Sequence, residues 1–445
     1  MARVPECARI MMTPEIIGIV AILILFALLT TGIPIAAALG LVGVVGLAAL
    51  TSPEAAIIKA GVIGWETISR YELGVLPLFL LMAHLCFAAG ASRDFFDVAA
   101  RLFGHRRGGL AIASIAGCGG FGAISGSSLA TAATVGLVAL PEMRKRGYAP
   151  SLATGAIAAG GTLGALVPPS GMLIVYGVIA EQPISKLFTA ALVPVATQAL
   201  FYIVTIMILC RMKPELGPVT PRATWKERGA AIARVADVSL LIAIVIGGLA
   251  IGWFTPTEAA SVGSVLALLL CLRRGKLNRE TLSTALREAL RTAGLIYAII
   301  IGAIIFSVFL GSTRIAGHLT DFVVASHLGA AGAAVLIVIV LLLLGSLLDG
   351  MALMLLTVPI FLPMMTGMGM SAIWFGIFVV RTIELGLVHP PLGMNVYIIQ
   401  GIAKNVPLGT IFRGVVPFLI SDFAHIALLI AVPATALWLP AVLAG

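Results

Sequence analysis

The sequence predicts an all-α integral membrane protein made of two inverted-topology repeats, each with a re-entrant helical hairpin and a broken transmembrane helix. Three observations lead to this fold: the composition, recurring apolar segments, and a set of residues repeated at one spacing. Of the 445 residues, 60% are hydrophobic and 11% charged, and the mean hydropathy of +1.13 is too high for a soluble domain. The apolar segments are about 17 to 25 residues long, which suits helices crossing a hydrocarbon core of about 30 Å. β-Barrel alternation is absent, so helices are expected to span the bilayer.

The first half of the chain alternates apolar segments with short polar breaks. A serine-rich break at 125–128 divides one apolar segment into the arms of a re-entrant hairpin, and the double proline at 168–169 interrupts a helix by removing backbone hydrogen bonds. The predicted elements are spans at 15–33, 35–51 and 71–90, the hairpin 109–143, the broken helix 149–181 and a span at 187–210.

The second half repeats this order of elements. Its amphipathic segment 277–291, like 92–106 in the first half, predicts a helical arm lying in the membrane interface. The predicted elements are spans at 237–254 and 256–272, the arm, a span at 292–310, the hairpin 329–365, the broken helix 369–403 and a span at 413–440.

Basic residues give the orientation in the membrane and the division into domains. Of the 28 Lys and Arg residues, 21 lie in five short polar segments, which the positive-inside rule places in the cytoplasm. This clustering between spans argues against nucleic-acid binding. The predicted domains are an N-terminal extension 1–14, inverted repeat 1 at 15–210, a cytoplasmic linker 211–236 and inverted repeat 2 at 237–445.

An internal repeat is visible at a constant offset of 222 residues. Each half has an odd number of full crossings, so the second half must enter the bilayer from the opposite side. Inverted repeats with interrupted helices at matching positions are typical of secondary transporters, whose sites lie near the membrane midplane. The matching pairs are Pro34 and Pro256, Ala37 and Ala259, Ala38 and Ala260, Pro141 and Pro363, Pro168 and Pro390, Pro169 and Pro391, Gly171 and Gly393, and Met172 and Met394.

The first hairpin tip and first break together predict a sodium site. Hydroxyl and freed carbonyl oxygens suit a hard cation, while the plain alternative is close packing of small residues between helices. Pro169 and Gly171 are expected to shape the break. The candidate ligands are Ser125, Gly126, Ser127, Ser128, Pro168 and Ser170.

The second tip carries a carboxylate, because Asp349 occupies the position of Ser127 after the offset of 222. An acid at membrane depth is costly unless it meets a cation, a proton or helix-terminal amides, so this tip predicts a second cation site. A simple N-cap role for Asp349 is compatible with ion binding. The other candidates around this site are Gly350, Gly386 and Pro390 as ligands, with Pro391 and Gly393 shaping the break.

Four further polar residues have weaker interpretations. Arg381 and Glu384, three apart on one helix face, are expected to pair as a scaffold. Arg314 is open to two interpretations, bidentate binding of a substrate carboxylate or snorkelling to the interface. His389 is a minor candidate for proton sensing.

Four motifs resemble one family. They are GAISGSSLATAATVGLVALPEM (122–143), GTLGALVPPSGM (161–172), GSLLDGMALMLLTVPIFLP (345–363) and ELGLVHPPLGMNVY (384–397). Together they closely resemble the large membrane subunit of tripartite ATP-independent periplasmic (TRAP) transporters, the DctM-like family. The resemblance covers nearly the whole chain and omits only about the first eleven residues.

The resemblance implies an elevator-type carrier of the ion-transporter-superfamily kind in the bacterial inner membrane. It further implies sodium as the coupling ion, a separate small four-helix membrane subunit and a soluble periplasmic substrate-binding protein. The cation ligands it implies coincide with the two tips and breaks, and it favours Arg314 as a substrate contact. Thr131 and Asn395 are the other substrate-binding candidates. Two departures from the family pattern, PPSG at the first break and His389 before the second double proline, bear on the ion sites.

The function expected from this reading is sodium-coupled import of a small organic acid, most simply a carboxylate, with no organic cofactor and no enzymatic chemistry. The first alternative is a sodium/dicarboxylate symporter that works without a binding protein. A remote alternative is an intramembrane serine hydrolase, suggested by the GxSG spacing around Ser125 but without an evident histidine partner.

Overall fold

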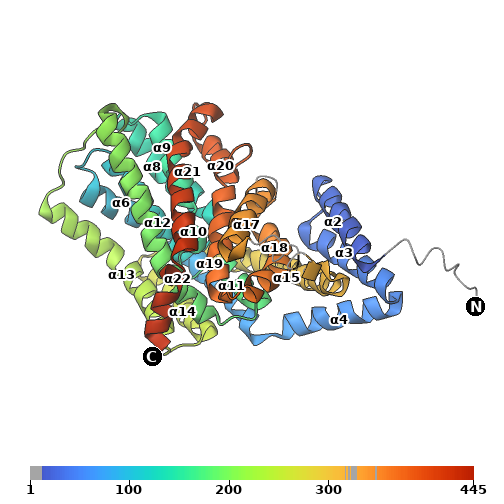
Figure 1. Ribbon diagram of the computed structural model, residues 1–445. Coiled ribbons are helices and arrows are strands. Elements are labelled where there is room, and N and C mark those ends of the chain that lie inside the picture. The colour runs from blue at the N-terminus through green and yellow to red at the C-terminus, as the bar shows by residue number, and fades with distance from the viewer. Residues whose placement is uncertain (1–12, 316, 319–320, 322–327, 346–347, 445) are drawn as a thin grey trace, which may run out of the picture.

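The computed structural model describes residues 13–444 except 316, 319–320, 322–327 and 346–347 (Figure 1). Within these residues every regular element is a helix. In the part of the chain that the structure describes, seven helices are long and apolar enough to cross a membrane, or eight if the bent pair Pro150–Leu166 and Gly171–Ile179 counts as one span. The prediction of an all-helical, multi-span protein is therefore confirmed. Of the predicted N-terminal extension, residues 1–12 lie outside the described part of the chain.

The first half contains the N-terminal helices, the first hairpin and the first break. Its helices are α2 (Pro14–Thr30), α3 (Ile35–Leu50), α4 (Pro53–Ser69), α5 (Val75–Ala88), α6 (Ala91–Phe103), α7 (Gly109–Ser125), α8 (Ser128–Lys145), α9 (Pro150–Gly161), α10 (Leu163–Leu166), α11 (Gly171–Ile179) and α12 (Ile184–Met212), with 3₁₀ turns η1 (Tyr71–Gly74) and η2 (Pro214–Leu216).

The second half follows the same order. Its described helices are α13 (Trp225–Ala250), α14 (Pro256–Arg273), α15 (Arg279–Thr313), α17 (Gly329–Gly345), α18 (Gly350–Gly367), α19 (Ala372–Gly386), α20 (Met394–Ile402), α21 (Leu408–Ala431) and α22 (Ala434–Ala444). Helices α8 and α18 begin 222 residues apart, as do α9 and α19. The spacing found in the sequence thus recurs in the starts of the helices.

Helix α4 is absent from the sequence prediction. Ser52 caps it by accepting a hydrogen bond from the Ala55 amide at 3.2 Å, and Pro53 occupies its first turn. Its charged residues, among them Lys59 and Glu66, keep its hydropathy below that of a span, so a search for apolar segments passes over it. In Figure 1 it runs along the lower edge of the molecule beneath α2 and α3.

Three other boundaries differ from the predicted ones. The arm 277–291 and the span 292–310 form one continuous helix, α15, because no proline lies between them and the single Gly294 stays within the helix. Helix α13 begins at Trp225, inside the predicted linker, where Thr224 and Glu227 form a capping box. The single span predicted at 413–440 is divided between α21 and α22 next to Pro433, which cannot continue a helical hydrogen-bond ladder.

Small residues let the helices approach closely. A Cβ atom added to Gly302 of α15 would lie 2.6 Å from the Ala36 carbonyl oxygen near the start of α3. A Cβ atom added to Gly414 of α21 would lie 1.9 Å from the Ser151 carbonyl oxygen of α9. Such contacts replace the hydrophobic driving force that is missing in lipid. They seat α15 on α3 and α21 on α9, the latter next to the hairpin and broken helices.

Candidate functional site

Both predicted hairpin tips open on one cavity of about 530 Å³. The cavity lies among the tip between α7 and α8, the start of α18, the first break, and the apolar faces of α5 and α15. Residues almost 260 positions apart in the chain therefore share one space. The polar or backbone-exposing residues of its lining are Ser125, Gly126, Ser127, Ser128, Pro169, Gly171, Thr292, Asp349, Gly350 and Glu384.

The first tip is held in a tight turn. Gly126 ends α7 with a φ of +58°, a conformation that a side chain would strain, and an added Cβ atom would lie 2.7 Å from the Pro169 carbonyl oxygen. Ser127 then starts α8, its Oγ accepting a hydrogen bond from the Ala130 amide at 3.4 Å. The Ser125 Oγ lies 2.7 Å from the Thr131 hydroxyl. The tip thus packs at Gly126 directly against the Pro169 carbonyl of the first break.

The first break turns the chain by 42° between α9–α10 and α11. The hydroxyl of Ser170 donates to the Ala165 carbonyl and accepts from the Leu173 amide at 3.2 Å, so it caps α11. Ser170 is fully buried, and neither it nor Pro168 is among the residues that line the cavity. In this conformation the break contributes Pro169 and Gly171 to the cavity.

The second tip presents its carboxylate as a helix cap. Asp349 Oδ2 accepts hydrogen bonds from the amides of Met351 at 3.0 Å and Ala352 at 3.4 Å at the start of α18. The side chain also lines the cavity. Capping and exposure to the cavity therefore coexist at Asp349. The preceding Ser346 and Leu347, part of the predicted tip, lie outside the described residues.

Most residues of the second break do not line the cavity. Gly386, the last residue of α19, packs on Gly345, with an added Cβ atom 3.3 Å from the Gly345 Cα. Gly393 precedes α20 with a φ of +53°. Pro390 and Pro391 are joined by a cis peptide bond, as are Pro168 and Pro169. From this region the cavity lining takes Glu384 and Leu387 instead of the predicted Gly386 and Pro390.

The three predicted substrate contacts are not brought together. Thr131 is fully buried and reaches the tip through Ser125. Asn395 is fully buried and donates from Nδ2 to the Ala158 carbonyl at 3.3 Å, tying α20 to α9. Arg314 ends α15 in an exposed position with a φ of +58°, outside the cavity lining.

The predicted pairing of Arg381 with Glu384 is wrong in its partners. Arg381 forms an ion pair with Asp422 of α21 and donates from Nε to the Gln198 Oε1 of α12 at 2.9 Å. Gln198 in turn donates to Asp422 at 2.6 Å. Spacing along one helix identifies neighbours on its face, but it does not reveal partners on other helices.

Glu384 is a functional candidate that the sequence reading treated as scaffold. Its side chain is fully buried, lines the cavity and accepts a hydrogen bond from the Ser128 hydroxyl at 3.3 Å. Its second oxygen, Oε2, has no hydrogen-bond partner among the described residues. A buried carboxylate oxygen left open in this way needs a cation, a proton or water. The sequence feature that could have identified Glu384 is its position six residues before the double proline at 390–391.

A multi-span helical fold with one bent helix pair, in which polar hairpin tips line a shared cavity, is typical of a membrane transport protein. Residues 22–435 match the family model described as "Tripartite ATP-independent periplasmic transporter, DctM component". The chain belongs to this family. It is thus a multi-pass protein of the bacterial inner membrane and a transporter permease, not an enzyme.

Named relatives agree with this assignment. The C4-dicarboxylate TRAP transporter large permease protein DctM of Pseudomonas aeruginosa is 34% identical over 84% of this chain and 88% of its own length. The sialic acid TRAP transporter large permease protein SiaM of Vibrio cholerae is 31% identical over 85% and 88%. The isethionate TRAP transporter permease protein DctMQ of Oleidesulfovibrio alaskensis is 29% identical over 94% of this chain, which spans 64% of that protein.

Solved structures share the fold at low sequence identity. The Alcanivorax borkumensis YdaH transporter is 14% identical with a TM-score of 0.63, covering 95% of this chain and 98% of that one. Neisseria gonorrhoeae MtrF is 16% identical with a TM-score of 0.51, covering 85% and 84%. At such identities the likeness concerns the fold alone.

Proposed function

We propose that this chain is the permease subunit of a TRAP transporter that imports a small organic anion together with sodium. The observation that carries the proposal is the cavity of about 530 Å³ in which both hairpin tips meet. Its hydroxyl and carbonyl oxygens and its two carboxylates are hard ligands of the kind that sodium takes, and apolar residues of α5 and α15 line another side of the cavity.

The expected substrate is a small carboxylate. The relatives carry the names of C4-dicarboxylate, sialic acid and isethionate transporters, all of which name organic anions. Sodium bound beside Asp349 and Glu384 offsets their negative charge, so that an anion can enter the same cavity without strong repulsion. Arg314, Thr131 and Asn395 remain the proposed substrate contacts, Arg314 after a movement that brings it toward the tips.

The proposed movement follows from the repeat. If the halves 15–210 and 237–445 are inverted, the two hairpins reach the cavity from opposite membrane faces. Supporting this, Asn395 joins α20 to α9, and the Ser128–Glu384 hydrogen bond joins the first hairpin to α19. Hairpins and broken helices thereby form one body that can move as an elevator against α2–α5 and α13–α15.

We further propose two protein partners, a four-helix Q subunit and a periplasmic substrate-binding P protein. The name DctMQ of the longer Oleidesulfovibrio alaskensis relative supports a Q partner. The binding protein would deliver the substrate directly, which distinguishes this system from a sodium/dicarboxylate symporter acting alone.

The test is uptake into proteoliposomes containing this chain and its Q subunit. Radiolabelled C4-dicarboxylate with the cognate binding protein should accumulate only under an inward sodium gradient. A potassium gradient of equal size controls for ionic strength. Sodium-independent accumulation would overturn the coupling, and undiminished uptake without the binding protein would favour the symporter alternative.

A further inference from the structure

A second cavity, of about 580 Å³, lies at the base of the first hairpin, away from the transport cavity. It is bordered by the end of α8, the start of α9 and the connection from α20 to α21. These segments lie in regions that the positive-inside rule places at the cytoplasmic face. We call it the basal cavity. Its charged lining residues are Arg144, Lys145 and Lys404.

The charges of the basal cavity are of one sign. Its lining contains no Asp or Glu, and none of its three cationic side chains has an ion-pair partner among the described residues. The positions of Arg144 and Lys145 need no anion to explain them, because cationic side chains in the last turn of a helix interact favourably with the helix dipole. Lys404, however, comes from a segment about 260 residues away. All three residues are exposed, so an anion that enters the cavity can reach cationic groups from two separate elements at once.

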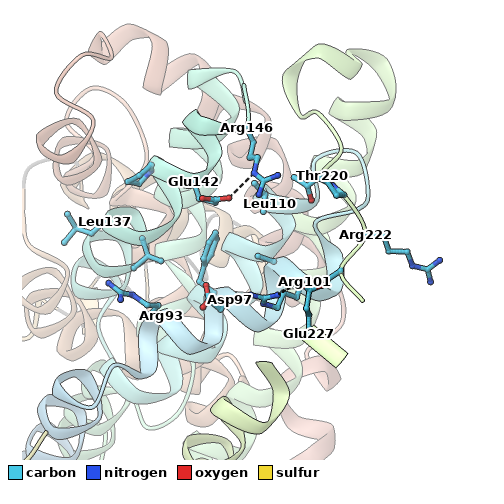
Figure 2. A pocket seen from close by; sticks show the side chains of 16 residues that line it. Arg93, Asp97, Arg101, Leu110, Leu137, Glu142, Arg146, Thr220, Arg222 and Glu227 are labelled. Carbon is cyan, nitrogen blue, oxygen red and sulfur yellow. Dashed lines mark hydrogen bonds and ion pairs between the residues drawn. The ribbon is translucent and has the colours of Figure 1, made fainter. Parts of the chain in front are cut away.

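A neighbouring cavity shows the contrast. It lies on another side of α8, has a volume of about 740 Å³ and shares only Pro141 with the basal cavity. Its four arginines are accompanied by three carboxylates, and Figure 2 shows Arg146 paired with Glu142, at 3.0 Å. Arg101 lies 3.7 Å from Glu227 in the same way. The positive charges of this neighbouring cavity are largely compensated by carboxylates of the protein, whereas those of the basal cavity are not.

The walls of the basal cavity point to the kind of anion. Beside the three cations lie Leu140, Pro141, Ile402 and Val406, an apolar surface that a free inorganic anion does not use. Cationic residues at the cytoplasmic ends of spanning helices lie at the level of the lipid phosphates. A phosphate diester with an attached acyl chain matches both parts of the lining.

We propose that the basal cavity binds the phosphate headgroup of an anionic phospholipid from the cytoplasmic leaflet. This lipid site is additional to the proposed transport function. Gly136 of α8 faces Ile399 and Ile402 of α20, with an added Cβ atom 3.1 and 3.2 Å from their methyl groups. A headgroup held by α8 and by the connection after α20 therefore clamps the first hairpin to the second broken helix. The bound lipid would thereby stabilise the packing between the helices that carry the cavity lined by the two hairpin tips.

The test is binding of short-chain lipids to the purified full-length chain in detergent, measured by thermal-shift titration. Dioctanoyl phosphatidylglycerol is compared with dioctanoyl phosphatidylcholine and with glycerol 3-phosphate. The variant R144Q/K145Q/K404Q removes the three charges, and R93Q/R101Q/R222Q removes three charges from the neighbouring cavity as the matched control. Phosphatidylglycerol should bind the first variant about 100-fold more weakly than the wild type and the control about as well as the wild type.

Equal weakening of both variants would overturn the site and leave only general surface attraction. Saturation by glycerol 3-phosphate at the concentrations that suffice for the lipid would overturn the lipid and identify a soluble phosphate ester. If the triple variant does not fold, Lys404→Gln and the charge-preserving Lys404→Arg decide the question. The first should weaken lipid binding and the second should keep it, and equal binding by both would refute the proposal.

Discussion

The two halves of the molecule share a backbone plan but differ in charge. At the first tip Ser127 starts α8 with one long hydrogen bond of 3.4 Å, while at the corresponding position Asp349 starts α18 with bonds of 3.0 and 3.4 Å. Among the residues that the structure describes, the fully buried charged ones also belong to the second half, namely Arg381, Glu384 and Asp422. Equivalent positions in a repeat can therefore keep one structural duty, capping, while only one of them carries charge.

This difference teaches how two tips with the same backbone plan can come to offer unlike surroundings to a cation. A hydroxyl cap costs little to bury and adds no net charge, so the first tip can bind a cation only through several neutral oxygens. A carboxylate cap is expensive when empty and strongly attractive to a cation. Four substitutions test whether charge, and not the shared backbone, makes the halves different.

The largest expected effect comes from breaking the buried ion pair of the second half. Arg381→Met leaves Asp422 as an uncompensated charge and removes a donor to Gln198, which should destabilise the protein by about 3–5 kcal/mol. Thermal or SDS-induced unfolding in detergent measures the loss. The double variant R381M/D422L should recover a large part of it, since replacing both charges by apolar groups removes the unpaired one. A double variant as unstable as the single one would contradict this account.

Asp349→Ala comes next and addresses transport. It removes a carboxylate that lines the cavity and two cap hydrogen bonds, so the apparent affinity for sodium in uptake should fall by about 100-fold, equivalent to about 3 kcal/mol. Asp349→Asn separates the two roles, because it keeps an acceptor for the cap and loses only the charge. Wild-type sodium dependence in the Asn variant would show that the second tip is merely a cap.

Much of this comparison could be predicted from the sequence, because hairpin tips and helix breaks depend on residues that are close together in the chain. Glycine, proline and serine mark the places where helices stop, and the offset of 222 residues matches Ser127 to Asp349 without a structure. The partners of Arg381 could not be read, because Asp422 and Gln198 lie 41 and 183 residues away on other helices. Glu384 was misread for the same reason. Its contact with Ser128 joins residues 256 positions apart.

A substitution at the turn of the first tip tests the backbone contribution. Gly126→Ala places a side chain at a φ of +58° and only 2.7 Å from the Pro169 carbonyl oxygen, so it should cost about 2 kcal/mol and push the tip from the break. Gly61→Ala in α4 is a suitable control, because nothing lies within 4 Å of its added Cβ atom and its φ is not positive. Equal thermal stability of the two variants would show that the tip does not rest on this contact.

The smallest effect is expected for Ser127→Ala, the neutral counterpart of Asp349→Ala. It removes one capping hydrogen bond of 3.4 Å and one of several oxygens facing the cavity, so stability should fall by about 1 kcal/mol and apparent sodium affinity by no more than about tenfold.

Ser127→Asp sharpens the contrast, since it gives the first tip the carboxylate of the second. If charge sets the difference between the tips, this variant should bind sodium more tightly but transport more slowly, because release must now overcome a charged ligand. Sodium-concentration curves of uptake, with half-saturation separated from maximal rate, measure both quantities. Identical curves for Ser127→Asp and the wild type would mean that the first tip does not contact the ion at all.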